Sequence, residues 1–343
     1  MKVLMTGAGA PGGPGIIKAL MSNPTVDLHV CDVNPYASGR FLVDGQFHLV
    51  PKATDHSFID RLMDICLTNK IEIIFPLVTL ELFKLSKYKK IFLNNNIKII
   101  VSDEDALNIA NNKGLLYKHL TENEIKVPDF YIVNSKKQLL SVSKQLGYPA
   151  VPIVMKPCIG NGSRGIRVLD DHVNRFDLLF NKKPLGIISR LADVLEDIGD
   201  NEIPELVVSE YLPGDELTID TIVENGKVED CLVRTRNTIN GGISTSGTFI
   251  FNDEVDQYIK RIVSKIPGLS GPIGFQVKKS FADEYLLLEC NPRIQGTSVA
   301  AFGLGINLPL RVLQNAAGIP REPIIKTAGI SFCRYYQEVF FDS

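Results

Sequence analysis

The sequence has 343 residues, of which 45% are hydrophobic and 22% are charged, and its formal net charge is −2. This length allows two or three compact units with a sizeable core. A nearly neutral chain gives no reason to expect a nucleic-acid partner, and no stretch approaches the roughly 18 apolar residues that a membrane span requires. The composition therefore predicts a globular protein that binds neither nucleic acid nor membrane.

Six cysteines and five histidines are dispersed along the chain. The cysteines show no CxxC spacing, and several lie in apolar runs, where a free thiol behaves as a small hydrophobe. The first residues form a strand pattern and do not resemble a signal peptide. We therefore expect a reduced, cytoplasmic protein without a zinc site or a disulfide framework.

Residues 1–105 alternate short apolar strand patterns with amphipathic helix patterns. The strand patterns are KVLM (2–5), DLHVCDV (27–33), IEIIFPL (71–77) and IKIIVS (97–102). Strands that alternate with helices predict a parallel, doubly wound sheet, so the expected fold class is α/β.

The pattern changes after residues 104–126, which read as helical. YPAVPIVMKP (148–157) is a strand that leads into the glycine-rich loop GNGSRG (160–165). From about residue 206 the chain reads as a series of hairpins, with Asn225-Gly226 as a strong turn signal. Antiparallel strands after a parallel sheet place a domain boundary near residue 105.

The stretch LLLECNPRIQG (286–296) ends an apolar strand in polar residues. Because side chains alternate along a strand, Glu289 and Asn291 share a face. If the register of the preceding strand brings Gln276 beside Glu289, three oxygen donors converge, and such donors suit Mg²⁺. Arg293 would then hold an anion close to the metal. The alternative is an ordinary strand end at the surface.

Three other segments carry candidate ligand-binding residues, each with a plain alternative. Lys156 precedes the 160–165 loop, which could wrap phosphate oxygens or form a simple turn. Glu210 and Glu216 flank a tight turn, where they could bind a nucleoside or face solvent. Arg234 and Arg236 could grip a carboxylate together if their strand continues, or they could face solvent.

Taken together, these motifs occur in the order found in the ATP-grasp superfamily. They are Lys113 in NNKGLLYKHL, Lys156 with its glycine loop, E-x-x-x-G-x-E at 210–216, Gln276, and E-x-N-P-R at 289–293. The chain resembles this superfamily over nearly its whole length, in particular the ATP-grasp module of the carbamoyl-phosphate synthase large subunit and its single-module relatives. The resemblance implies a Rossmann-like pre-ATP-grasp domain at 1–105 and an ATP-grasp domain at 106–343. Within the latter it implies a lid subdomain at about 116–205 and a C-terminal antiparallel-sheet subdomain at about 206–343.

The resemblance also implies roles for single residues. Lys113 and Lys156 would contact the phosphates of ATP, with the loop that contains Gly162 and Ser163 closing over them. The remaining nucleotide contacts would come from Glu210 and the backbone at Tyr211 and Leu212 for the adenine, Leu287 against its face, and Glu216 for the ribose.

For the chemistry, the resemblance implies that Gln276, Glu289 and Asn291 bind one or two Mg²⁺ ions, or Mn²⁺ in their place. Arg293 would steady an acyl phosphate or its carboxylate precursor. Two positions depart from the usual pattern: Asn112 stands where an acidic residue often precedes the first lysine, and Gln276 stands where many relatives have a carboxylate. The neutral amide at 276 makes a second metal ion less secure.

The implied activity is an ATP-dependent carboxylate–amine ligase that forms an acyl phosphate and releases ADP and phosphate. Its substrates would be a small carboxylic acid and an amine, and relatives often form homodimers. One alternative is a module that needs a partner, as in carbamoyl-phosphate synthesis, and another is a nucleotide-binding protein without activity. A third is an NAD-dependent dehydrogenase, because GAGAPG (7–12) with Asp32 satisfies the dinucleotide fingerprint, although Pro11 and Pro14 make the turn irregular.

Overall fold

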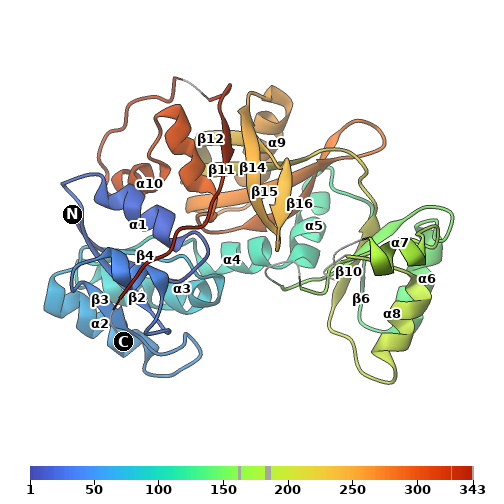
Figure 1. Ribbon diagram of the computed structural model, residues 1–343, viewed down its shortest axis with the longest axis horizontal. Helices are drawn as coiled ribbons and strands as arrows, with labels where there is room; N and C mark the ends of the chain where they lie inside the picture. The colour runs from blue at the N-terminus through green and yellow to red at the C-terminus, as the bar shows by residue number, and fades with distance from the viewer. Residues whose placement is uncertain (161–163, 182–186, 326, 342–343) are drawn as a thin grey trace. The chain divides into compact units, whose positions relative to one another are not determined.

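The chain folds into two units, each assembled from separate segments (Figure 1). The computed structural model describes residues 1–160, 164–181, 187–325 and 327–341. Unit 1 contains Met1–Asn108, Leu217–Gln276 and Cys290–Ser343, and unit 2 contains Ile109–Glu216 and Val277–Glu289. Within the described residues, the helices are too short or too polar to cross a membrane.

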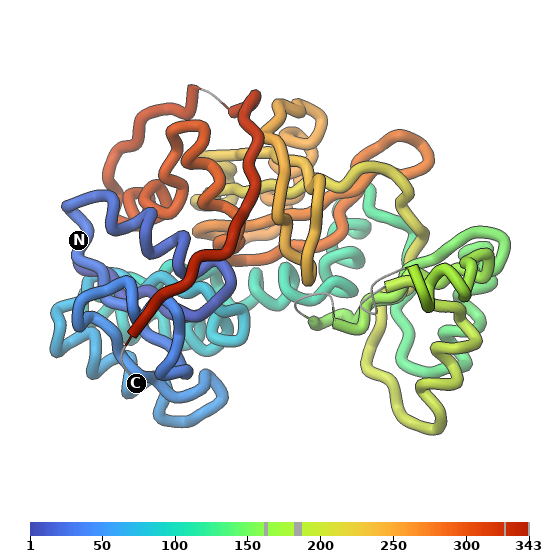
Figure 2. Tube along the Cα trace, in the orientation of Figure 1, coloured from blue at the N-terminus to red at the C-terminus, as the bar shows by residue number. Residues whose placement is uncertain are grey.

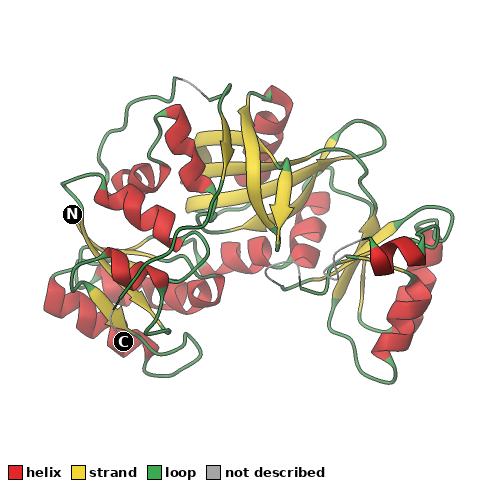
Figure 3. Ribbon diagram, viewed as in Figure 1, coloured by secondary structure: helices red, strands yellow, loops and turns green. Residues whose placement is uncertain are grey.

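Unit 1 begins with a five-stranded sheet in the order β3-β2-β1-β4-β5, and all of its pairings are parallel. The strands are β1 (Lys2–Thr6), β2 (Asp27–Asp32), β3 (Phe47–Leu49), β4 (Ile73–Phe75) and β5 (Lys98–Ile99). The helices that connect and follow them are α1 (Gly13–Met21), η1 (Ser38–Leu42), α2 (Phe58–Asn69), α3 (Thr79–Leu93) and α4 (Glu104–Asn111). Figure 3 shows helices gathered around these strands, which confirms the predicted doubly wound α/β arrangement.

Alternation along β1 divides the interior of this sheet into two cores. Val3 and Met5 belong to a cluster that also contains residues of α1, whereas Leu4 belongs to a cluster with residues of α2 and α3. Because both faces of the sheet are covered, its strands read as continuous apolar runs in the sequence.

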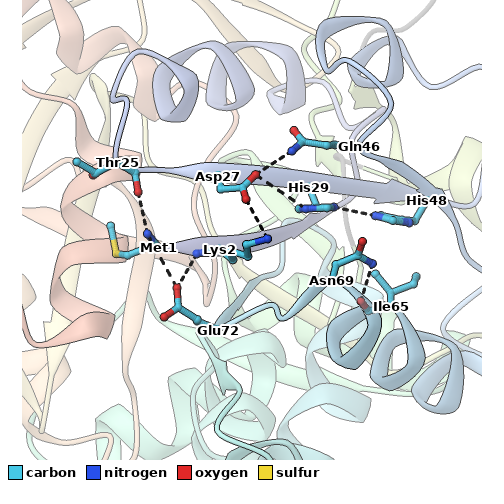
Figure 4. Close-up of polar contacts among 10 residues, drawn as sticks. All are labelled: Met1, Lys2, Thr25, Asp27, His29, Gln46, His48, Ile65, Asn69 and Glu72. Carbon is cyan, nitrogen blue, oxygen red and sulfur yellow. Dashed lines mark hydrogen bonds and ion pairs between the residues drawn. The ribbon is translucent and has the colours of Figure 1, made fainter.

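Polar contacts join the first strands near their starts (Figure 4). The amino group of Met1 donates to the carbonyl of Thr25 at 2.7 Å, and the backbone N–H of Lys2 donates to Glu72 at 2.6 Å. His29 on β2 and His48 on β3 stack, with their Nδ1 and Nε2 atoms 3.0 Å apart. These contacts hold neighbouring strands of the parallel sheet in register.

The carboxyl ends of β1 and β4 mark the point where the strand order reverses. Ligands of open α/β sheets bind at such a point. Gly7 has φ +68°, and a Cβ atom at this position would lie 2.5 Å from Val78 Cγ2, so the loops after β1 and β4 are in close contact. At Gly12 a Cβ atom would lie 2.3 Å from Gly296 Cα. The segments 7–12, 77–79 and 293–296 therefore meet within unit 1, and we call them the switch-point edge.

A seven-stranded sheet has the order β13-β14-β12-β11-β15-β16, with β17 paired to β14. Its strands are β11 (Glu216–Glu224), β12 (Lys227–Thr235), β13 (Thr238–Asn240), β14 (Ile243–Ile250), β15 (Gly271–Lys279), β16 (Tyr285–Asn291) and β17 (Ser331–Cys333), and its helices are α9 (Asp253–Ser264), η2 (Ser298–Leu304) and α10 (Leu308–Ala317). Asn225 and Gly226 have φ values of 50° and 73°, as a tight hairpin turn between β11 and β12 requires. The hairpin predicted from Asn-Gly is therefore present.

The segment after β17 returns across unit 1 to the N-terminal part of the chain (Figure 2). The Nζ atom of Lys18 donates to Gln337 Oε1 at 2.7 Å, and the ring of Phe341 stacks on Phe41 with a centroid separation of 4.0 Å. Residues from both ends of the sequence thus pack together in unit 1.

Unit 2 contains a five-stranded sheet in the order β6-β10-β7-β8-β9. Its strands are β6 (Phe130–Val133), β7 (Ile153–Pro157), β8 (Arg167–Leu169), β9 (Ile188–Ser189) and β10 (Leu206–Glu210), and its helices are α5 (Lys113–Glu122), α6 (Lys136–Gln145), α7 (Arg175–Phe180) and α8 (Leu191–Ile198). The pairings of β10 with β6 and β7 are antiparallel. Apolar side chains of α6 and α8 form one core with this sheet.

Candidate active site

Two buried lysines face one carboxylate in unit 2. The Nζ atom of Lys113, the first residue of α5, lies 3.7 Å from Glu289 Oε2 and donates to the carbonyl of Gly160 at 3.2 Å. Lys156 on β7 is 5% exposed and Lys113 is 7% exposed. Two lysine side chains beside Glu289 offer N–H donors that suit phosphate oxygens.

Tyr117 holds the second lysine in place. Lys156 Nζ donates to the hydroxyl of Tyr117 and to the carbonyl of Leu288, both at 2.9 Å, and that hydroxyl donates to the carbonyl of Leu287 at 2.8 Å. Tyr117 was absent from the sequence prediction. A signal for it exists, because Tyr117 follows Lys113 by four residues in α5 and so lies on the same face of the helix.

The surroundings of Lys156 act strongly on its pKa. Burial, followed by the charge of Lys113, lowers the pKa of its ammonium group to about 7, while the carboxylates of Glu289 and Glu216 oppose the shift. Lys156 is therefore near the midpoint of its titration at neutral pH, and an incoming phosphate would restore its charge.

The residues predicted to hold the nucleoside lie at the end of β10 and beyond it. Glu210 Oε1 accepts the backbone N–H of Asp129 at 3.0 Å, Leu212 is buried, and the side chain of Leu287 is fully buried. Their contacts with adenine and the contact of Glu216 with ribose stay predictions. Gly162 and Ser163, predicted in the phosphate loop, lie outside the described residues.

Lys278 lies beside the predicted nucleoside-binding residues, although it was not among the residues predicted from the sequence. Its Nζ atom lies 5.1 Å from the ring centroid of Tyr211. Burial lowers the pKa of Lys278, and the carboxylate of Glu216 acts in the opposite direction. Lys278 follows Gln276 by two residues on β15, so strand alternation places both on one face.

The three predicted metal ligands offer one carboxylate and two amides. Glu289 and Asn291 lie two residues apart on β16, and Gln276 lies on β15. Within the described residues no group of three or more His, Cys, Asp or Glu side chains could hold a metal ion. The chemistry of these donors suits Mg²⁺ that arrives with a nucleotide, because Mg²⁺ takes few protein ligands and completes its shell with phosphates and water; that the three residues meet at one ion stays a prediction.

Arg293 is anchored to the switch-point edge of unit 1. Its Nε donates to Thr79 Oγ1 at 3.0 Å, and its Nη1 donates to the carbonyl of Ile294 at 2.9 Å. Thr79 is the first residue of α3, directly after the loop that follows β4. The predicted anion-binding arginine therefore lies where an open parallel sheet receives its ligands.

Asp32, the acid of the dinucleotide fingerprint, has structural partners. Its Oδ2 accepts the N–H of Gly9 at 2.7 Å and its Oδ1 accepts the N–H of Asn34 at 2.9 Å. The carboxylate thus holds the glycine loop in shape, and we do not propose a dinucleotide here.

The two arginines predicted as a pair have separate surroundings. Arg234 is 1% exposed, and its Nε donates to Asp220 Oδ2 at 2.9 Å. Strand β12 ends at Thr235, so the continuous strand assumed in the prediction is not present, and Arg236 Nη2 donates to the carbonyl of Gly242 at 2.7 Å. A different arginine, Arg334, lies close enough to Arg234 to be affected by its charge, because burial and then Arg234 lower the pKa of Arg334.

Comparisons with known proteins agree with this arrangement. A family model described as "ATP-grasp in the biosynthetic pathway with Ter operon" matches residues 202–335, and a model for the PylC-like N-terminal domain matches residues 4–100. The first spans β11 to β17 and the candidate metal ligands, and the second spans the parallel sheet.

Individual relatives are distant. The chain is 26% identical over 220 residues to the carbamoyl phosphate synthase large chain of Methanosphaerula palustris, a match that covers 64% of this chain and 20% of that protein. It is 24% identical over 206 residues to the glutamate–LysW ligase ArgX of Sulfolobus acidocaldarius, covering 58% of this chain and 67% of that protein.

A solved structure shares the fold. N5-carboxyaminoimidazole synthetase from Staphylococcus aureus superposes with a TM-score of 0.67 at 14% identity, covering 93% of this chain and 77% of that one. The predicted combination of a Rossmann-like N-terminal domain and an ATP-grasp fold is thereby confirmed, and residues 202–335 match an ATP-grasp family model.

Proposed function

We propose that this protein is an ATP-dependent carboxylate–amine ligase, which activates a carboxylic acid as an acyl phosphate and releases ADP and phosphate. One observation carries the proposal: two buried lysines, Lys113 and Lys156, lie beside Glu289 in unit 2. The relatives named as ligases and as carbamoyl phosphate synthase support the same class of reaction. The chain spans only a fifth of the carbamoyl phosphate synthase that it matches, so that protein's full activity is not proposed for it.

In this proposal, Lys113 and Lys156 bind the phosphates of ATP and neutralise the charge that develops as the terminal phosphoryl group leaves. Catalysis of this kind depends on positioning and charge rather than on a covalent protein nucleophile. Glu289, Asn291 and Gln276 would hold Mg²⁺, which supplies further charge neutralisation when it is bound. Glu210, Tyr211, Leu212, Glu216 and Leu287 would hold the nucleoside.

Arg293 is proposed to orient the substrate carboxylate for attack on the γ-phosphate. Its guanidinium is held by Thr79 and by the carbonyl of Ile294, so its position is set before substrate arrives. An amine would then displace phosphate from the acyl phosphate. Both substrates are small molecules in this proposal.

ADP release with Mg·ATP should be measured against a panel of carboxylic acids, each with and without amino acids and ammonia. Release that requires one acid and one amine is the expected result. Binding of Mg·ATP without ADP release for any pair would favour a partner-dependent module or a nucleotide-binding protein without activity. Failure to bind Mg·ATP would contradict the proposal.

A further inference from the structure

Unit 1 contains two buried arginine–aspartate clusters that differ in how completely they are satisfied. In the first, Asp230 accepts from Arg311 through Nε at 2.9 Å and Nη2 at 2.8 Å, and from Arg321 Nη1 at 2.5 Å. Arg321 also donates from Nη2 to Asn315. A two-point fork between guanidinium and carboxylate is the usual geometry of a structural pair.

The second cluster leaves part of its arginine without a partner. Arg234 donates to Asp220 through Nε alone, and its buried Nη1 has no hydrogen-bond partner among the described residues. The other carboxylate oxygen of Asp220 accepts from Gln295 Nε2 at 3.0 Å and from Ser298 Oγ at 2.6 Å. Gln295 and Ser298 therefore donate to the Asp220 oxygen that a second nitrogen of Arg234 would contact in a two-point fork. Asp220 is therefore saturated, whereas Arg234 still lacks an acceptor.

A second arginine adds positive charge at the same place. Arg334 is half-buried, its Nη2 donates to the carbonyl of Pro11 at 3.0 Å, and its backbone N–H donates to Thr245. Pro11 belongs to the switch-point edge, where Arg293 is also anchored through Thr79. Arg234 is linked to the same edge through Asp220 and Gln295, so both arginines are connected to the switch-point edge. Buried polar atoms in proteins normally have partners, so the orphaned nitrogen points to an anion that binds there.

We propose that Arg234 and Arg334 form a subsite for a second carboxylate of the acid substrate, so that the ligase acts on a dicarboxylic acid. The inference rests on the proposed function, in which Arg293 receives the carboxylate that reacts. Strands β1 and β4 are neighbours in one sheet. Arg334 contacts Pro11 in the loop after β1, and Arg293 contacts Thr79 just after the loop that follows β4, so both arginines would bind the same small molecule. A monocarboxylic acid leaves Arg234 Nη1 unsatisfied.

Binding should be measured by calorimetric titration of the full chain with matched acids. The dicarboxylic probes are malonate, succinate, glutarate, adipate, L-aspartate and L-glutamate, each compared with the monocarboxylate of equal chain length. We expect at least one dicarboxylate to bind about tenfold or more tightly than its match, as one charge-assisted, forked contact provides. Equal binding across every pair in the wild-type protein would overturn the inference.

Variants separate this subsite from the nucleotide site. Arg334→Gln should bring the binding ratio of each dicarboxylate to its match close to one, with the affinity for Mg·ATP unchanged. Arg234→Lys, which keeps a charge beside Asp220 but removes Nη1, should reduce the ratio as well, and thermal unfolding will check that it folds. Arg321→Gln is the matched control, because it removes an arginine from the satisfied Asp230 cluster and should leave the ratio as in the wild type.

The outcomes distinguish this inference from the proposed function. A wild-type preference for a dicarboxylate that survives Arg334→Gln would overturn the subsite while leaving the ligase proposal in place. Loss of Mg·ATP binding in the wild-type protein would instead contradict the proposed function, whatever the acids do.

Discussion

Lys156 Nζ donates to the carbonyl of Leu288 at 2.9 Å, one residue before Glu289 on β16. A buried ammonium on β7 is thereby joined to the strand that supplies the candidate metal-binding carboxylate. Any ligand that draws Lys156 toward a phosphate acts on the backbone next to Glu289. Lys156 and Glu289 should therefore respond together to substitution at either residue.

The affinity for Mg·ATP should fall as the pH rises above 7. Lys156 has a pKa of about 7 in the folded protein, and bound phosphates favour its charged form, so at pH 8 binding must take up a proton. Calorimetry in buffers of different ionisation enthalpy should find an uptake approaching about one proton at pH 8 and close to none at pH 6. Lys156→Met should abolish this dependence. Equal proton uptake in the variant and the wild type would contradict the assignment.

The same residue makes a prediction for the stability of the ligand-free protein. Its pKa falls from 10.5 in the unfolded chain to about 7 in the folded protein, so the unfolded chain binds more protons between these values. The free energy of unfolding therefore gains a contribution that rises with pH from about 7 to 10.5. Denaturant unfolding of the wild type and Lys156→Met across this range should show a flatter profile for the variant.

Tyr117→Phe should loosen Lys156 without removing it. The lost hydroxyl accepts from Lys156 and donates to the carbonyl of Leu287, and losing such buried hydrogen bonds costs on the order of 1–3 kcal/mol of stability. Steady-state kinetics should show a KM for ATP raised several-fold. Leu139→Ala, which opens a cavity in the separate core of α6, provides a control that loses stability but should retain the KM. A Tyr117→Phe variant with wild-type KM would show that the hydroxyl has only a structural role.

Substitutions at the candidate metal ligands should act in opposite directions. Glu289→Gln removes the only carboxylate of the predicted set, so turnover should fall by about a hundredfold or more and half-saturation should need more Mg²⁺. Gln276→Glu adds a carboxylate and should lower the Mg²⁺ concentration for half-saturation. Titrations of activity with Mg²⁺ test both. An unchanged Mg²⁺ requirement in both variants would exclude these residues from the metal site.

Glu81 at the start of α3 predicts an acid-side dependence of stability. Burial, with a smaller contribution from the charge of Asp32, raises its pKa to about 7, and the hydrogen bond from the hydroxyl of Thr6 opposes this shift. The folded protein then holds a proton that the unfolded chain releases near 4.5, so stability falls as the pH rises from about 4.5 to 7. The expected loss is on the order of 2–3 kcal/mol. Thermal unfolding of Glu81→Gln between pH 4.5 and 7.5 should lack it, whereas Glu72→Gln, which alters an exposed carboxylate, should keep it.

Local sequence patterns predicted most of the fold. The alternation of apolar runs and helices over residues 1–105 gave the parallel sheet, and Asn225-Gly226 gave a hairpin whose φ values are those the turn demands. The sequence also placed Lys113, Lys156 and Glu289 in one motif set, and the structure brings these three residues together in unit 2. The sheet and the hairpin were predictable because spacing and turn residues determine local structure, whereas the grouping of the three site residues came from the resemblance to the ATP-grasp superfamily.

Contacts between residues far apart in the sequence could not be predicted from local patterns. Asp220 and Arg234 pair across a hairpin, and Gln295 and Ser298 join them from more than 60 residues along the chain. Arg334 reaches Pro11 from the opposite end of the sequence. Alternation indicates which face a residue occupies, but it does not identify the partner on another element, so the sequence left open whether Arg234 and Arg236 act together and did not indicate that Arg234 pairs with Asp220.

Each unit is assembled from separate segments of the sequence, so unit 1 cannot fold completely until late in synthesis. The parallel sheet of unit 1 has all its strands once Ile99 has been made, yet α10 (Leu308–Ala317), whose apolar side chains share a core with α1, is synthesised some 200 residues later. Until then the ribosome-bound intermediate exposes the apolar face of α1. The segments of unit 2 are synthesised before this face is covered. Truncated chains that stop before residue 308 should therefore be prone to aggregation. To produce either unit alone, its separate segments would have to be joined, because trimming from one end leaves both units incomplete.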